Sequence, residues 1–132
     1  MRVIITVVFV SIGVILSYGM VHGVRLAHTA KLHNLYGQAE QKHRRAMRWA
    51  LWLTLLGAVL IEFGLVQAFG RQAAGSEVRA HLYFAIPFLL SLIAMNTVTN
   101  GHRHPVIHGW LSLITIFILY PFTFFTGMRL LW

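Results

Sequence analysis

The chain has 132 residues, of which 58% are hydrophobic and 11% are charged, and its mean hydropathy is +0.70. A soluble domain of this length carries roughly a quarter of charged residues, so the composition excludes an ordinary soluble domain and favours a membrane protein in contact with the lipid bilayer. The net charge of +8 comes from basic residues at the ends of apolar segments, which indicates anionic lipid headgroups and not nucleic acid as the partner.

Four apolar segments follow one another along the chain, at about residues 3–24, 47–69, 79–98 and 106–128. A helix of about 20 residues reaches about 30 Å, which is the thickness of the hydrocarbon core. Backbone polar groups must be paired inside lipid, so each segment is expected to be a transmembrane helix. The sequence therefore predicts an all-α integral membrane four-helix bundle, with residues 1–132 forming a single transmembrane domain.

The loop between the first two segments is also expected to be helical. Residues 25–35 are good helix formers, Tyr36–Gly37 is expected to break the helix, and Gln38 resumes a helical pattern. We therefore expect a helical hairpin between spans one and two whose tip projects beyond the headgroups.

Three prolines lie in or beside the last two spans. Pro105 suits the first position of the fourth helix, because a first-turn residue needs no backbone N–H donor. Pro87 and Pro121 lie inside spans three and four, where membrane helices tolerate a kink if neighbouring groups satisfy the freed carbonyls.

The basic residues predict the orientation of the protein. Four spans place both termini on one side, and cytoplasmic loops carry the excess of Lys and Arg. The first and third loops hold seven basic residues (Arg25, Lys31, Lys42, Arg44, Arg45, Arg48, Arg103) and the other side holds four (Arg2, Arg71, Arg79, Arg129). Aromatic residues typical of membrane interfaces mark the two levels: Trp49, Trp52, Trp110, then Phe69, Tyr83, Trp132. The two loops are expected in the cytoplasm and the termini outside.

Histidine is the unusual residue, with eight copies against three acids. Seven fall on one membrane side: His22, His28, His33, His43, His102, His104 and His108; His81 lies at the other end. His104 and His108 are four residues apart and share a helix face. His22 lies near the end of the first span and His43 one turn before the second. Folding would bring these four to a similar depth.

A neutral imidazole is the commonest metal ligand and a standard axial ligand of haem iron. The chain has no cysteine and few acids, which excludes thiolate sites and favours haem b or a copper or zinc ion held by histidine. We predict His22, His43 and His108 as cofactor ligands and His43, His104 and His108 as metal ligands. The alternative is that these amphipathic side chains simply lie at the interface and bind no cofactor.

Glu62 is a second candidate, because an ionisable group deep in span two is costly and usually faces the interior of a bundle. It could handle protons, as in a transporter, or be a protonated residue that tightens helix packing.

Gly19 and Gly23 form a pair of small residues that predicts close helix contact. Motifs of hydrolases, kinases and NAD enzymes are absent, and enzymatic activity stays open.

Residues 43–47 (His-Arg-Arg-Ala-Met), residues 79–84 (Arg-Ala-His-Leu-Tyr-Phe), and His108 followed by Leu119–Tyr120 and Thr126–Gly127 carry a family resemblance. The chain from residue 20 onward resembles a small four-span bacterial membrane protein family of uncharacterised function, associated with cytochrome c oxidase assembly. Only His43 and His108 match the positions of that family. A histidine expected in the middle of span three is absent.

The resemblance implies a location in the bacterial inner membrane and a role near terminal oxidases, and the distribution of basic residues then predicts periplasmic termini. We expect a protein that binds haem b or a metal and assists oxidase assembly or electron transfer. The alternative is a non-catalytic accessory subunit of a larger membrane complex such as a respiratory oxidase.

Overall fold

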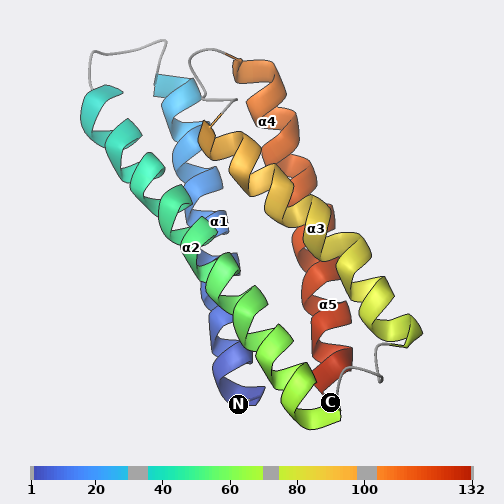
Figure 1. Cartoon of the computed structure of the whole chain (residues 1–132). Coiled ribbons are helices and arrows are strands. Elements are labelled where there is room, and N and C mark those ends of the chain that lie inside the picture. Colours follow the sequence, from blue (N-terminus) through green and yellow to red (C-terminus); the bar gives the residue numbers. More distant parts are fainter. Residues whose placement is uncertain (1, 30–35, 70–74, 98–103, 132) are drawn as a thin grey trace.

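The computed structural model describes residues 2–29, 36–69, 75–97 and 104–131, and this part of the chain is entirely helical apart from the residues that flank α3 and α4. Its elements are α1 (Arg2–Thr29), α2 (Tyr36–Phe69), α3 (Ser76–Thr97), and the continuous run of α4 (Pro105–Ile114), η2 (Thr115–Leu119) and α5 (Tyr120–Leu131). α1 and α2 lie side by side, and α3 crosses the rod made by α4, η2 and α5 (Figure 1). The two chain ends lie at the same end of the molecule (Figure 1).

Three segments of the described chain are long and apolar enough to cross a membrane: Val3–Leu26, Val78–Thr97 and Pro105–Arg129. At most 33% of the residues in each such segment are buried. Many large apolar side chains of these segments are exposed, which suits lipid and would be costly in water. The chain has the features of a multi-pass membrane protein.

At the connection between the first two helices, both helices extend beyond the predicted apolar segments. α1 continues to Thr29, and α2 already begins at Tyr36. The expected break at Tyr36–Gly37 is therefore wrong, and these residues form the first turn of α2. Glycine is tolerated there because the first-turn N–H groups have no partner inside the helix in any case. Residues 30–35, between the two helices, lie outside the described residues.

A π-helical turn precedes Pro121 in the last span. Proline lacks the N–H that would bond the carbonyl four residues earlier, and its ring crowds that carbonyl. In η2, which ends two residues before Pro121, the backbone widens so that the Tyr120 N–H bonds to the Thr115 carbonyl, five residues back. Such single π turns occur inside otherwise regular helices. Pro87, by contrast, lies within α3 without interrupting it.

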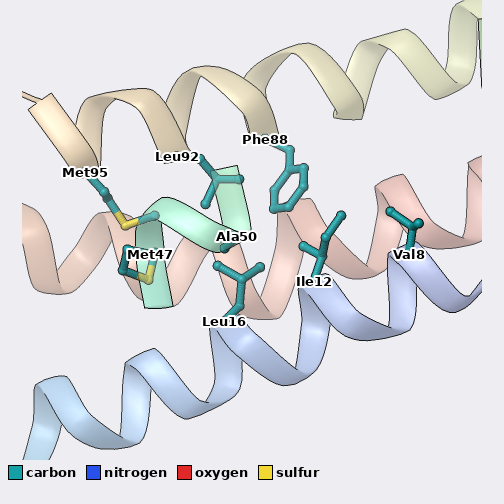
Figure 2. Packing of buried hydrophobic residues seen from close by; sticks show 8 residues of the cluster. All are labelled: Val8, Ile12, Leu16, Met47, Ala50, Phe88, Leu92 and Met95. Carbon is teal, nitrogen blue, oxygen red and sulfur yellow. The ribbon is translucent and has the colours of Figure 1, made fainter. Parts of the chain in front are cut away.

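The core lies where α1, α2 and α3 meet (Figure 2). Its buried residues are Val8, Ile12, Leu16, Met47, Ala50, Phe88, Leu92 and Met95, and Tyr120 packs against them from the last rod. Ala50 is small enough for α2 to approach the neighbouring helices closely. In a membrane, such packing replaces the hydrophobic effect as the force between helices.

A buried hydroxyl pair joins α3 to the last rod. Thr115 Oγ1 lies 2.8 Å from Ser91 Oγ and 2.6 Å from the Leu111 carbonyl, and Ser91 Oγ lies 2.7 Å from the Phe88 carbonyl. Each hydroxyl has one proton to donate: Ser91 donates to the Phe88 carbonyl, and the single Thr115 proton is shared between Ser91 Oγ and the Leu111 carbonyl. The pair links α3 to the rod made by α4, η2 and α5 through buried side chains.

Candidate functional site

His43 is held against α1 by two glycines. Its Nδ1 lies 3.0 Å from the carbonyl oxygen of Gly19. A Cβ at Gly19 would lie 2.9 Å from the Met47 sulfur and would crowd α2, whereas a Cβ at Gly23 would lie 3.7 Å from the His43 ring, which is an ordinary van der Waals contact. The predicted close helix contact at Gly19 and Gly23 is confirmed. The α2 side chains nearest to the two glycines are those of His43 and Met47.

The hydrogen bond determines which nitrogen of His43 carries the proton. A carbonyl oxygen can only accept, so Nδ1 must donate to Gly19. In a neutral ring, Nε2 then keeps its lone pair and can bind a metal. Donation from one ring nitrogen to a backbone carbonyl is the usual way in which a protein orients a ligating histidine.

Burial keeps the His43 ring neutral. His43 precedes the apolar part of α2, and burial lowers the pKa of His43 below its ordinary value. The Gly19 carbonyl acts in the opposite direction, while the neighbouring rings of His108 and His22 lower the pKa further. A metal ion binds the neutral form, so no proton has to be displaced from His43 near pH 7.

His108 is the partner that the fold brings to His43. The two ring centres are 6.0 Å apart and the ring planes make an angle of 69°. His108 lies in the first turn of α4, where its N–H bonds to the His104 carbonyl at 2.9 Å and its carbonyl accepts from Ser112 Oγ at 2.7 Å. These bonds start the helix and fix the position from which the ring reaches α2.

His22 is close enough to influence the charge of His43, and it is half-buried on α1. Its ring centre lies 4.4 Å from that of Tyr18, at an angle of 60°. The Tyr18 contact was not expected, although the i, i+4 spacing on a helix is a signal for it. The Gly19 carbonyl was missed as well, because a sequence pattern does not reveal which backbone carbonyl faces a neighbouring helix.

His104 does not join this pair in the structure. It occupies the position before α4, where it is exposed, and its side chain caps no backbone group. Its carbonyl oxygen accepts the hydrogen bond from the His108 N–H. Among residues 2–29, 36–69, 75–97 and 104–131, no three histidine or carboxylate side chains come close enough to hold one metal ion together.

The remaining candidates lie elsewhere or outside the described residues. Glu62 belongs to α2, but its side chain lies outside the described residues, and its role stays a prediction. His33 and His102 also lie outside them. His28 is exposed near the end of α1. His81 is buried at the start of α3, with Nδ1 3.2 Å from Thr126 Oγ1, far along the chain from His43.

Comparison with known proteins found no match, whether to a family model, to a curated protein or to a solved structure. The family resemblance of residues 43–47 and 108 therefore stays a prediction. The site rests on its own geometry: a neutral, oriented imidazole on α2 with a second imidazole beside it.

Proposed function

We propose that this protein crosses the bacterial inner membrane four times and holds a metal centre between His43 and His108, either the iron of haem b or a copper or zinc ion. The observation that carries the proposal is the pair of imidazoles with ring centres 6.0 Å apart, one of them oriented by the Gly19 carbonyl. The other features of the site support the same chemistry.

The separation of the rings suits two ligands of one metal. With metal–nitrogen bonds of about 2 Å and a distance of about 1.1 Å from ring centre to nitrogen, two imidazoles on opposite sides of a metal have centres about 6 Å apart. The angle of 69° between the planes is also compatible, because each ring can rotate about its own metal–nitrogen bond.

The number of ligands favours haem iron over a bare ion. Haem iron takes four nitrogens from the macrocycle and needs only two axial ligands from the protein. A zinc or copper ion usually takes three or four protein ligands, which would require His22 or water beside His43 and His108. Iron with two histidine ligands has no open position, so such a centre would serve electron transfer in the respiratory membrane. The link to oxidases rests on the family resemblance alone.

Absorption spectra and metal analysis of the purified protein test this centre. We expect a Soret band that shifts on reduction for haem, or stoichiometric copper or zinc without that band for a bare ion. His43→Ala and His108→Ala should each lower the bound cofactor at least about tenfold, since even outer-shell changes cost that much. His28→Ala is the control, because His28 is exposed on the same side, and it should retain the cofactor.

Folding must be checked in the same samples by circular dichroism and size exclusion, because His43 also fills the space beside Gly19 and Gly23. His108→Ala removes the second ring without touching that contact. A folded wild-type protein that carries neither haem nor metal would contradict the proposal. So would full occupancy in His108→Ala.

The proposal of four spans requires that α2 also crosses the membrane, in addition to the three segments described above. Its stretch from Met47 to Phe69 reaches about 34 Å, enough to cross the hydrocarbon core. Met47 and Ala50 are buried against the neighbouring helices, while outward-facing apolar residues cover the other side: Trp49, Trp52, Leu56, Val59 and Phe63. A helix whose exposed face is covered by large apolar side chains fits lipid. The extension of α1 to Thr29 and the start of α2 at Tyr36 support a helical hairpin beyond this span.

Single cysteines test whether α2 crosses the membrane, because the native chain has none. Gln41→Cys and Gly75→Cys place an exposed thiol before and after the proposed span. In spheroplasts, an impermeant maleimide should label Gly75→Cys at once and Gln41→Cys only after permeabilisation. Labelling of both thiols from the same side would show that α2 does not cross. The reverse pattern would contradict periplasmic termini.

A further inference from the structure

The outer face of α2 carries a shallow hollow of about 450 Å³, lined by Arg45, Arg48, Trp49 and Trp52. Positions three, four and seven residues apart share one face of a helix. The two indole rings are 62% and 65% exposed, and both arginines are exposed. This face therefore combines a double positive charge with an apolar surface, and it points away from the core.

No carboxylate of the described chain neutralises this charge. The chain has three acids, and Glu40 forms its ion pair with Arg44, at 2.5 Å. Glu62 follows Arg48 by 14 positions on α2, a distance of about 21 Å along the helix. Glu77 belongs to the first turn of α3, and the start of α3 lies at the opposite end of the molecule from the start of α2 (Figure 1). Among the side chains that the structure describes, no carboxylate forms an ion pair with Arg45 or Arg48.

The order of residues matches the layers of a membrane surface. Arg45 and Arg48 come at the start of the proposed span, at headgroup level, and Trp49 and Trp52 follow toward the hydrocarbon. Guanidinium groups bind phosphate oxygens in a fixed, bidentate geometry. Indole rings prefer the boundary between headgroups and acyl chains. A ligand with a phosphate at one end and an acyl chain at the other would satisfy both halves.

We infer that this hollow is a binding site for one anionic phospholipid, with its phosphate on Arg45 and Arg48 and its acyl chains against Trp49 and Trp52. The inference rests on the proposed span of α2 and is independent of the metal centre. It differs from a general attraction to anionic membranes, because it places a preferred lipid at one position on one helix.

Quenching of tryptophan by brominated lipids tests the site. In a Trp110→Phe/Trp132→Phe background, Trp49 and Trp52 are the remaining indoles. The protein is placed in phosphatidylcholine vesicles that contain a small fraction of either phosphatidylglycerol or phosphatidylcholine brominated in the acyl chains. We expect the brominated phosphatidylglycerol to quench as if it were enriched about tenfold at the site, since each arginine near the surface favours anionic lipid.

The variant Arg45→Gln/Arg48→Gln should remove this preference. The matched control is Arg79→Gln/Arg129→Gln, which removes the same charge from exposed positions at the other end, and it should keep the preference. Equal loss in both variants would overturn the site, because the effect would then follow net charge. Equal quenching by the two brominated lipids would overturn it too. Absence of quenching by either lipid would contradict the α2 span itself.

Discussion

The substitution Gly13→Ala should lower the free energy of unfolding by about 2 kcal/mol, which is the usual cost of overpacking a close contact. A Cβ at Gly13 would overlap the phenol ring of Tyr120. That ring has little freedom to move, because its hydroxyl donates to the Phe9 carbonyl and its faces pack near Phe88 and Phe124. Relief of the overlap would break the hydrogen bond between the last rod and α1.

Gly109→Ala is the matched control, because nothing lies within 4 Å of a Cβ at that helical position. It should be neutral or stabilising by up to about 1 kcal/mol, the ordinary gain of alanine over glycine in a helix. Reversible unfolding in mixed micelles, followed by circular dichroism, measures both variants. The loss at Gly13 should shrink when Tyr120→Leu is added, and an additive result would contradict the proposed contact.

The substitution Phe88→Ala should be the most damaging single truncation in the core, with a loss of about 3 kcal/mol. Phe88 is 1% exposed and points from α3 toward α1 (Figure 2), and its ring centre lies 5.8 Å from that of Tyr120. Its removal leaves a cavity at the junction of the helices. Lipid outside does not compensate for that loss, because association inside a membrane depends on packing contacts.

Leu90→Ala, on the same helix, provides the comparison. Leu90 is 59% exposed and faces away from the core. In lipid its truncation exchanges one apolar contact for another and should change the free energy of unfolding by no more than about 0.5 kcal/mol. The same micelle unfolding assay applies. Similar losses for Phe88→Ala and Leu90→Ala would mean that the observed inner and outer faces of α3 are wrong.

The sequence predicted the helices well because the signal for them is local. Runs of apolar residues as long as the membrane is thick require helices, whatever their neighbours are. The predicted first, third and fourth segments agree with Val3–Leu26, Val78–Thr97 and Pro105–Arg129 to within a few residues. Two local details were not foreseen. Helix α2 starts at Tyr36, since a first turn accepts glycine, and a π-helical turn precedes Pro121.

The candidate site could be predicted only in part. The surplus of histidine on one side is a property of composition and spacing, and it pointed to His43 and His108. Whether two rings meet depends on how each helix is rotated and how closely the backbones approach. Gly19 and Gly23 allow α2 to lie close to α1, which brings the His43 ring to a backbone carbonyl 24 positions away. His104, on the same predicted face as His108, stays exposed because it precedes the first turn of α4.

The sequence by itself therefore determined the helical class and the bounds of three apolar spans to within a few residues, because hydropathy and segment length are local properties of the chain. Only the tertiary structure decided that His108 meets His43, that Tyr120 closes over Gly13, and that Arg45 and Arg48 share a face with two tryptophans that nothing in the described chain covers. These contacts depend on the rotation of each helix about its axis and on the spacing between helices. Both are set by the packing of small and large residues from distant parts of the chain.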